Sequence, residues 1–403
     1  MTQQQPQTKA VRSLPDIIIN WNGDKLSIPV ADKSVIRVLK PTYPPELRQS
    51  EIQAIVEQGI NGIRDQVYSA KRVVLLLEDS SRATVTAGLV EIIMNRLLRI
   101  RGKKGGIDVV IAAGAHYNLA EKDLAKKVGT AAYEVHSAID SEKLIEVGES
   151  KTGVPFVFNK KVIEADLRLS VSTVNIHPLA GYSGGGKILL PGVAGLKTIF
   201  AFHSLAPGVP GVYENAMRML INEVTQVLPI SFSWQLLANP HGQIVGIVGD
   251  QLFAAHHRAI ALLERMVTVT PPPDPVDLII AGCRPFNLNL LSTGKSLPQL
   301  PKLLRKGGRL ALLNEAFQGP GGHYWRTEPE VVRRQKEYYQ FLFRHHRVGI
   351  YSPNTKKEMF SSLFPVNFRL IENTTNLAAF VGSAKPLRIL VLPYAPVTLI
   401  KPN

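Results

Sequence analysis

Cysteine is almost absent from this chain of 403 residues, in which Cys283 is the single one. One thiol cannot form a disulfide framework or a cysteine-rich zinc site, and no redox or zinc motif surrounds it, so we assign Cys283 no role. A single cysteine also agrees with a protein that stays in the cytoplasm.

Long apolar runs are also missing, and none reaches the length that a membrane-spanning helix needs. The first residues, Met1 to Val11, are polar and rich in glutamine, without the apolar core of a signal peptide. We therefore expect a frayed tail, no membrane anchor and a cytoplasmic location. Internal repeats and low-complexity tracts are absent as well.

Acidic residues are the scarcer charged class, with 32 Asp and Glu against 47 Lys and Arg, which gives a net charge of +15. Such a basic balance raises the question of a nucleic-acid partner. The basic residues are spread over many segments, however, and no zinc-finger or RNP-type motif accompanies them. We expect no nucleic-acid partner, but a surface that attracts small anions.

Aliphatic runs and amphipathic periodicity alternate along the first part of the chain, which predicts an α/β fold with a mainly parallel sheet flanked by helices. The expected strands are Arg72 to Leu77, Ile107 to Ala113 and Leu167 to Val174. The expected helices are Ser50 to Tyr68, Val85 to Ile100, Tyr213 to Val227 and Gln251 to Met266, with a further helix capped by Asn118 and Glu121. Residues 15–40 suggest a small hairpin-like entry.

A proline-rich segment, residues 271–275, is the best candidate for a linker. It divides the chain into an N-terminal cofactor-binding domain, residues 12–270, and a smaller C-terminal α/β domain, residues 276–403, and we expect the active site in the cleft between them. The strands expected in the second domain are Val276 to Ala281, Arg309 to Leu313, Arg347 to Tyr351 and Leu387 to Leu392. A capping box is expected at Thr327 and Glu330, and a turn at Gly319 to His323.

The most informative stretch, Asn175 to His203, reads NIHPLAGYSGGGKILLPGVAGLKTIFAFH. Its glycines 184–186 let the backbone bend with positive φ and approach a ligand, so that successive amides can form an anion-binding nest. A nucleotide-triphosphate P-loop is the first alternative, because Gly181, Gly186 and Lys187 satisfy its spacing. It fails at Ile188, where a P-loop has a hydroxyl for Mg²⁺, and at Pro191, which would interrupt the helix that must follow.

Polar residues follow three of the expected strands, at the sheet edge where open α/β folds bind ligands. Asp79 and Arg82 follow the first strand, His116 the second, and His177 the third. Taken singly, each can be explained by a purely structural role, because Asp-Ser-Ser is a common helix cap and a lone histidine is more often structural than catalytic. Their shared position favours a functional site.

The same stretch resembles the nickel-pincer-nucleotide lactate racemase family, whose motif has the form H-x-x-A-G-x-S-G-G-x-K, then L-P-G-V-A-G and a further histidine. The resemblance implies that Lys187 carries the nucleotide covalently, that His203 binds nickel, and that His116 and His177 are acid/base catalysts. It implies cofactor contacts for Asp79, Arg82, Ser183, Gly184, Gly185 and Gly186. A neutral imidazole suits nickel, but one protein ligand suffices only if the cofactor supplies the other donors.

In the second domain the family has the element P-x-D-x-N-L-Y-Q-x-x-K, which corresponds here to Pro285 to Lys295. Lys295 is retained and, together with Ser292 and Arg82, is expected to contact the substrate. Asn287 replaces the acid, Leu291 the tyrosine and Ser292 the glutamine, so the substrate need not be lactate. Trp325 and Tyr394 are candidate contacts from the smaller domain.

The resemblance implies a racemase or epimerase that inverts C2 of a 2-hydroxy acid through hydride transfer to and from the nickel-pincer nucleotide. Malate, hydroxyglutarate and sugar acids are as compatible with the basic balance as lactate is. Expected partners are the hydroxy acid, transiently the enzymes that build the cofactor, and a second copy of the chain in a homo-oligomer. The alternative is a nucleotide-binding or cofactor-carrying protein of the same fold without racemase turnover.

Overall fold

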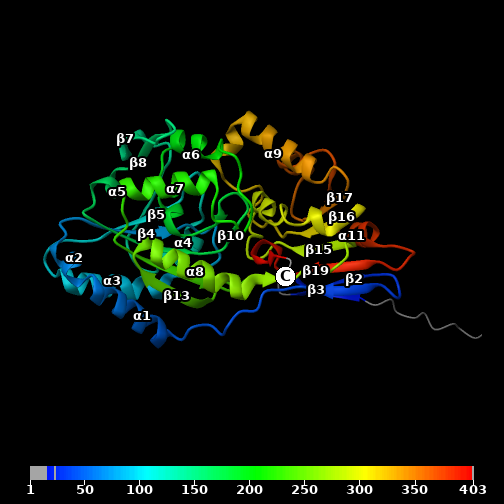
Figure 1. Ribbon diagram of the computed structural model, residues 1–403, viewed down its shortest axis with the longest axis horizontal. Helices are drawn as coiled ribbons and strands as arrows, with labels where there is room; N and C mark the ends of the chain where they lie inside the picture. The colour runs from blue at the N-terminus through cyan, green and yellow to red at the C-terminus, as the bar shows by residue number, and fades with distance from the viewer. Residues whose placement is uncertain (1–15, 22–23, 402–403) are drawn as a thin grey trace, which may run out of the picture.

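The computed structural model describes residues 16–21 and 24–401, and the expected tail, Met1 to Val11, lies outside the described residues. Two α/β units lie side by side in Figure 1, the larger coloured blue to green and the smaller yellow to red. Each is built on a six-stranded sheet, which confirms the α/β fold with mainly parallel sheets flanked by helices.

The sheet of the larger unit has the strand order β13-β12-β9-β4-β5-β6. All its neighbours are parallel except β13, which pairs with β12 in the antiparallel direction. Its strands are β4 (Val73–Glu78), β5 (Asp108–Ala112), β6 (Glu134–Val135), β9 (Leu167–Thr173), β12 (Phe232–Ala238) and β13 (Ile244–Asp250). The sequence pattern predicted β4, β5 and β9 but neither β12 nor β13.

Helices cover both faces of this sheet. The buried residues of each parallel strand therefore point alternately into two hydrophobic cores, one on each face. In β4, Val73, Leu75 and Leu77 enter the core beneath α1 to α4, whereas Val74 and Leu76 enter the core beneath α5 to α7. The helices are α1 (Gln49–Gly62), α2 (Arg64–Ser69), α3 (Ala87–Arg101), α4 (Glu121–Val128), α5 (Lys160–Glu164), α6 (Leu196–His203), α7 (Ala216–Val227) and α8 (Leu252–Val267).

Short elements complete the larger unit. A two-stranded ribbon packs beside α6, and a second ribbon carries part of the motif that begins at Asn175. They are β7 (Leu144–Glu149) with β8 (Pro155–Asn159), β10 (Ile176–His177) with β11 (Gly181–Tyr182), and the 3-10 turns η1 (Ser141–Lys143) and η2 (Gly185–Ile188).

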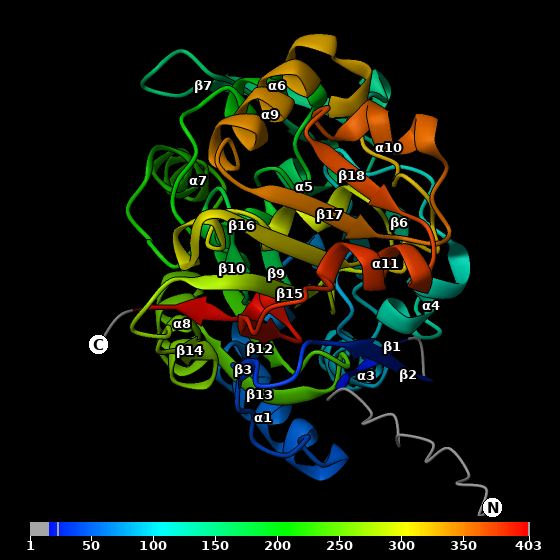
Figure 2. The same ribbon diagram turned by 90° about the vertical axis from the view of Figure 1, so that its right-hand side faces the viewer.

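The smaller unit, which faces the viewer in Figure 2, has a wholly parallel sheet of order β18-β17-β16-β15-β19-β3. Its strands are β3 (Val35–Val38), β15 (Val276–Gly282), β16 (Leu304–Leu313), β17 (Arg347–Tyr351), β18 (Phe368–Ile371) and β19 (Arg388–Leu392). Its helices are α9 (Pro329–Leu342), α10 (Lys357–Leu363) and α11 (Thr374–Val381), with the 3-10 turns η3 (Leu291–Ser296), η4 (Pro301–Leu303), η5 (Tyr324–Thr327) and η6 (Ala395–Val397). The four strands expected here are all present.

The N-terminal segment lies with the smaller unit rather than with the larger one. Strands β1 (Asp16–Trp21) and β2 (Asp24–Pro29) form the expected hairpin, and its apolar face packs with α11 against the second sheet. Val35–Val38 pairs in parallel with β19, about 350 residues further along the chain. The expected N-terminal domain of residues 12–270 therefore includes a segment that folds onto the other sheet.

The two units are also joined near the proline-rich segment. Strand β14 (Thr268–Val269), which ends just before residues 271–275, pairs with β20 (Leu399–Ile400) close to the C-terminus. The chain thus crosses between the units after β3 and again after β14.

Three local expectations about helices are wrong. The helix expected over Ser50 to Tyr68 is interrupted at Ile63, which separates α1 from α2. Asn118 does not cap α4, because its φ of 56° takes it out of the capping geometry and Ala120 precedes the helix. Thr327 does not cap α9, since its hydroxyl donates to the Tyr324 carbonyl instead.

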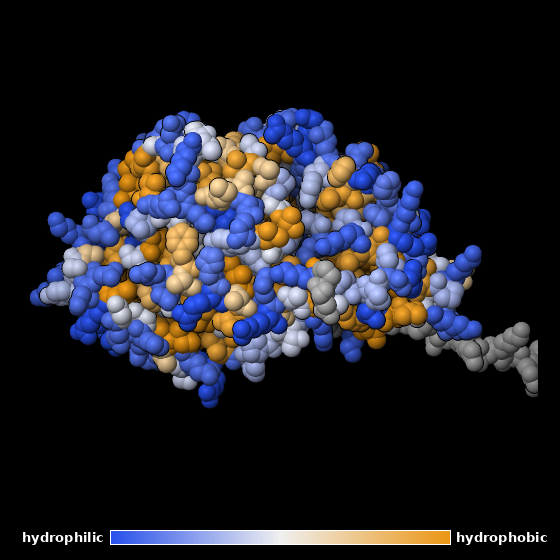
Figure 3. Space-filling model, in the orientation of Figure 1, coloured by the Kyte–Doolittle hydropathy of each residue, from blue (hydrophilic) through white to orange (hydrophobic). Residues whose placement is uncertain are grey.

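Hydrophilic residues cover much of the face drawn in Figure 3, with hydrophobic ones interspersed. Within the described residues, no helix is both long enough and apolar enough to cross a membrane.

Candidate active site

A pocket of about 550 Å³ lies between the two units, and both contribute to its lining. The larger unit supplies the residues that follow β4, β5 and β9, and the smaller unit supplies η3, η5 and α9. The lining includes these residues predicted from the sequence: Asp79, Arg82, His116, His177, Ser183, Gly184, Lys187, His203, Ser292 and Lys295. Those that follow β4, β5 and β9 lie along one edge of the sheet, because the carboxyl ends of parallel strands are on the same side.

Asp79 and His116 form a hydrogen-bonded pair at the ends of β4 and β5, with 2.6 Å between Oδ2 and Nδ1. Burial alone would raise the pKa of Asp79, but the charge and hydrogen bond of His116, the Ser81 hydrogen bond and the charge of Arg82 lower it well below its ordinary value. An ionised carboxylate can only accept, so Nδ1 of His116 is the donor and Nε2 is the ring nitrogen directed away from Asp79. This is the arrangement of a general base held by a carboxylate.

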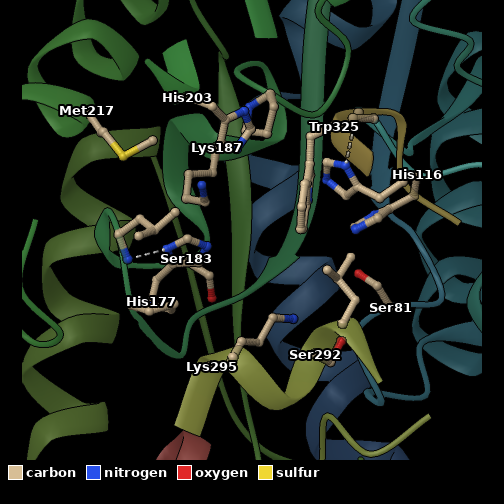
Figure 4. Close-up of a pocket in the computed structure, with 18 of the residues that line it drawn as sticks. Ser81, His116, His177, Ser183, Lys187, His203, Met217, Ser292, Lys295 and Trp325 are labelled. Atoms are coloured by element: carbon tan, nitrogen blue, oxygen red, sulfur yellow. Dashed lines mark hydrogen bonds between the residues drawn. The ribbon is translucent and has the colours of Figure 1, made fainter. Parts of the chain in front are cut away.

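His177 lies in β10, across the pocket from His116 in Figure 4. Its Nδ1 accepts hydrogen bonds from the backbone amides of Leu179, at 3.2 Å, and Ala180, at 3.1 Å. Burial, followed by the charges of Lys187, Arg82, Lys295 and Arg218, lowers the pKa of His177 well below its ordinary value. The imidazole is therefore neutral.

Lys187 lies in η2, and its amine is 5.4 Å from the centroid of the Phe202 ring. Burial, together with the charges of Arg218 and Arg82, lowers the pKa of Lys187 well below its ordinary value. Among the described residues no carboxylate forms an ion pair with this amine. A buried amine that deprotonates easily is a good nucleophile for a covalent tether.

His203 is the last residue of α6, and its Nδ1 donates to the carbonyl of Ile199 at 2.9 Å. That bond leaves Nε2 bare for a metal, the usual state of a ligating histidine. Burial, with the charge of Lys187, lowers the pKa of His203 to about 4, so the ring is neutral near neutral pH. No group of three or more His, Cys, Asp or Glu that could hold a metal occurs in the described part of the chain.

These observations fit the expected cofactor. A single protein ligand beside a nucleophilic lysine suits a metal whose remaining donors come from an organic group tethered to that lysine. Arg82 also places positive charge at the pocket, which suits a phosphate or a carboxylate.

The glycine-rich segment does not form the expected nest. Gly184 and Gly185 have positive φ, but only Gly184 lines the pocket. The amide of Gly185 donates to the Gln235 side chain, and the amide of Lys187 donates to the carbonyl of Gly184. The amides of Gly185 and Lys187 are thus used inside the protein.

The contacts of Ser183, Gly185 and Gly186 indicate structural roles for these residues. The Ser183 hydroxyl donates to the carbonyl of Thr173 and accepts from the amide of Asn175, so it braces the turn after β9. A Cβ at Gly185 would lie 2.6 Å from His256, and one at Gly186 would lie 2.5 Å from Thr225. These glycines allow the turn to pack against α8 and α7. They do not contact the pocket.

The P-loop alternative is excluded by the backbone. After Lys187 the chain makes only the short turn η2, and the next α-helix, α6, begins eight residues after the segment ends at Ile188. A triphosphate cradle needs a helix that starts at the lysine.

In the smaller unit, Lys295 lies 3.8 Å from the centroid of the Phe286 ring, and Arg82 approaches the same ring at 5.5 Å. Asn287, which replaces the family's acid, donates to Glu315 at 2.7 Å, and Arg284 pairs with the same carboxylate. Asn287 therefore supports this loop and does not line the pocket, whereas Leu291 and Ser292 do.

Sequence reasoning missed one histidine. His323 was expected in a turn, but it lines the pocket, and its backbone forms a bridge with His116. The two rings meet edge to face with centroids 4.9 Å apart. Trp325, two residues later, lines the pocket as expected, whereas Tyr394 packs near His241 and does not line it. Nothing in the local sequence around His323 indicates this position.

Comparison with known proteins shows which family the chain resembles. A sequence model of the lactate racemase N-terminal domain matches residues 21–211. A lactate racemase of Thermoanaerobacterium thermosaccharolyticum is 23% identical over 77% of this chain and 76% of its own length, and one of Lactiplantibacillus plantarum is 22% identical over 70% and 69%. The chain thus resembles lactate racemases over about three quarters of its length, and its residues 21–211 match their N-terminal domain.

Solved structures share the fold of this chain. The lactate racemase apoprotein from Thermoanaerobacterium thermosaccharolyticum has a TM-score of 0.77 at 19% identity and covers 96% of this chain and 100% of its own. A protein from Thermotoga maritima has a TM-score of 0.69 at 16% identity and covers 90% and 100%. At such identities the likeness concerns the fold alone.

Proposed function

We propose that this chain is a member of the lactate racemase family, an isomerase that inverts the C2 stereocentre of a 2-hydroxy acid. The observation that carries the proposal is the pocket itself, where the Asp79–His116 pair, the easily deprotonated Lys187 and the bare Nε2 of His203 come together. Such a set serves chemistry at a carbon that bears a hydroxyl group.

The cofactor in this proposal is the nickel-pincer nucleotide, bound covalently to Lys187 and ligated through nickel by His203. When bound, it would supply the hydride chemistry that removes hydrogen from C2 and returns it. The chain supplies orientation and proton transfer: Lys295 and Arg82 bind the carboxylate, and His116, held by Asp79, takes the hydroxyl proton at Nε2. His177, expected as a second acid/base, lies across the pocket from His116.

The substrate in this proposal is wider than lactate. The pocket carries Leu291 and Ser292 where the family element has tyrosine and glutamine, and aromatic side chains from the smaller unit, Trp325 and Tyr338, line the same space. Cytoplasmic location, brief encounters with cofactor-building enzymes and self-association belong to the proposal as well.

The test is a panel of enantiopure 2-hydroxy acids offered to cofactor-loaded protein, with loss of optical purity as the readout. We expect at least one acid to racemise or epimerise. If loaded protein with a stoichiometric nickel adduct leaves the whole panel unchanged, the carrier alternative replaces the proposal.

A further inference from the structure

A buried ion pair adjoins the active-site loop, residues 79–83, which follows β4. Glu78 ends β4, and its Oε1 lies 2.9 Å from Nζ of Lys127 in the last turn of α4. The exposed fraction is 8% for Glu78 and 2% for Lys127. Neither residue takes part in the chemistry proposed for the pocket. Because a buried ion pair is often no more stable than apolar side chains of similar size, stability alone does not account for this pair.

The hydrogen bonds of Lys127 reach both ends of the active-site loop. Besides Glu78, Nζ of Lys127 donates to the backbone carbonyl of Thr84 at 2.7 Å. Glu78 is the residue before the loop and Thr84 the residue after it, so one ammonium group holds the two ends together. Both bonds have a charged donor, which makes them stronger than bonds between neutral groups.

The same network joins the active-site loop to the end of β9. Oε2 of Glu78 accepts from the amide of Thr173 at 2.7 Å, and Oε1 accepts from the hydroxyl of Thr173 at 2.7 Å. The Thr173 hydroxyl is used as a donor there, so at 2.8 Å it accepts from the hydroxyl of Thr84. Thr173 ends β9, four residues before His177. The network therefore links two strand ends that lead into the pocket.

The end of α4 is fastened to the chain just after the active-site loop. The amide of Thr86 donates to the carbonyl of Lys126 at 3.0 Å, and the hydroxyl of Thr86 donates to the carbonyl of Lys127 at 2.8 Å. These two bonds fix the place from which the Lys127 side chain reaches the loop.

The active-site loop has a defined shape of its own. Oδ1 of Asp79 accepts from the amide of Ser81 at 3.0 Å and from its hydroxyl at 2.5 Å, and the amide of Arg82 donates to the Asp79 carbonyl at 3.3 Å. These internal bonds set the shape of the loop, whereas its direction depends on how its ends are held. A shift at those ends would move Asp79 away from His116, from which it is only 2.6 Å distant.

We infer that Glu78 and Lys127 are positioning residues for the active site. The pair holds the active-site loop and the end of β9 in one arrangement, in which Asp79 meets His116. Neither residue of the pair is catalytic, since Lys127 does not line the pocket and both oxygens of Glu78 are bound within the protein. The expected effect on turnover rests on the proposed function, whereas the expected effect on the Asp79–His116 contact does not.

The first test separates positioning from stability by removing one charge or both. Lys127→Met leaves a buried carboxylate without its cation and should lower the unfolding temperature. Combining it with Glu78→Gln removes both charges, and the glutamine oxygen can still accept from the Thr173 amide. This double variant should melt closer to the parent, but it has no side chain that holds the Thr84 carbonyl.

In the cofactor-loaded enzyme, kcat of the double variant should stay about 10-fold or more below that of the parent, because small misplacements of reacting groups are costly. A double variant that recovers both the unfolding temperature and kcat overturns the inference, since the pair would then have a structural role only.

Arg101→Met is the matched control for the loss of a buried cation. Arg101 has an exposed fraction of 1%, and its guanidinium donates to the carbonyls of Ala70 and Lys71, which precede β4 at the end away from the pocket. The variant should lose stability but keep the kcat of the parent at a temperature where both are folded. A loss of kcat equal to that of the double variant would make the effect a general consequence of instability and overturn the inference.

The second test reads the Asp79–His116 contact in the full-length chain without cofactor. ¹⁵N shifts of the His116 ring, detected through its carbon-bound protons and assigned with His116→Gln, are followed from pH 6 to pH 9. In the parent, Nδ1 should stay protonated throughout, because it donates to a carboxylate. In the double variant the neutral ring should share its proton between both nitrogens, while Arg101→Met should match the parent.

The two readouts fail separately. Unchanged ¹⁵N shifts in the double variant overturn the inference whether or not the enzyme is active. Changed shifts, in a chain whose loaded parent inverts no acid, support the inference and count against the proposed function alone.

Thr173→Val tests the same network with both charges in place, so it does not depend on the folding of the double variant. It removes only the hydroxyl that links Glu78 to Thr84. We expect the ¹⁵N shifts of His116 to move in the same direction and kcat to fall, each by less than in the double variant. If both quantities equal those of the parent, the network has no part in positioning the site.

Discussion

At the scale of the residue, the electrostatics of the pocket follow from burial of cations with few anions. Lys187 and Lys295 are both partly buried near Arg82, and desolvation together with neighbouring positive charge lowers the pKa of each lysine well below its ordinary value. Two similar lysines therefore differ mainly in place: Lys187 lies near the Phe202 ring in the larger unit, and Lys295 lies over Phe286 in the smaller one.

That pair gives a prediction with its own control. Lys187→Ala should abolish nickel retention and activity while the fold stays intact, because a covalent tether has no substitute. Lys295→Ala should keep the nickel adduct and lose substrate affinity. Native mass spectrometry and nickel analysis of both variants decide between them, and equal nickel content in Lys187→Ala and the parent would remove Lys187 from its role.

His203 allows a second prediction at this scale. His203→Ala should keep the organic adduct on Lys187 but hold nickel more weakly and react more slowly, because the bare Nε2 is the ligand that the chain provides. His323→Ala, which removes a neighbouring ring whose Nδ1 is occupied, should keep nickel at the parent level. Unchanged nickel and rate in His203→Ala would exclude it as a ligand.

At the scale of the element, strands whose core is aliphatic could be predicted, whereas β12, with its mixed aromatic and polar composition, could not. β4 is a continuous apolar run, and β9 has an aliphatic residue at every second position of its first five. β12 is fully buried but contains Ser233 and Gln235. These polar side chains are satisfied by tertiary hydrogen bonds, Ser233 to Ser170 at 2.7 Å and Gln235 to the Gly185 amide at 2.8 Å. Periodicity alone cannot reveal partners that come from another part of the chain.

The residues of the candidate site also fall into those that the sequence pattern could predict and those that it could not. Asp79, His116 and His177 could be predicted, because each follows a strand end that sequence pattern identifies. His323 could not, because its place in the pocket depends on the backbone bridge between the loop after β5 and the segment before η5. The edge pairing of β3 with β19 escaped prediction for the same reason.

This bridge between the units yields an element-scale prediction. A Cβ at Gly322 would lie 2.3 Å from the carbonyl oxygen of Tyr117, so Gly322→Ala should displace the segment that holds His323 beside His116. The rate should fall about 10-fold or more while most of the fold persists, since a small misplacement of reacting groups is costly. Gly106→Ala is the control, because nothing lies within 4 Å of its Cβ. Equal rates in both variants would deny the bridge a role in catalysis.

At the scale of the whole molecule, buried neutral histidines tie stability to pH. Burial lowers the pKa of His136 to about 4 and that of His256 to about 3, and each donates from Nε2 to a backbone carbonyl, of Ala194 and Ser183 respectively. Because their folded pKa values lie below the ordinary value near 6.5, the unfolded chain binds more protons in acid.

The stability these histidines provide is therefore complete above about pH 6.5 and is lost as the pH falls toward 4 and then 3. We expect the unfolding temperature to drop across that window. The free energy of unfolding should fall with it by several kcal/mol in total. Thermal melts from pH 8 to pH 4 measure it, with His256→Gln as a variant whose slope should be shallower. An unfolding temperature that stays constant down to pH 4 would contradict this account of the core.

The central claim is that C2 is inverted by a hydride that leaves and returns to the same carbon, and deuterium at C2 tests it most directly. An enantiopure acid labelled at C2 is incubated with the loaded enzyme in ordinary water. The opposite enantiomer is then isolated, and its deuterium content is measured by mass spectrometry. A product that keeps the deuterium is the predicted result, because a hydride held in the site does not exchange with solvent. A product that carries protium at C2 would show inversion by proton abstraction and contradict the account.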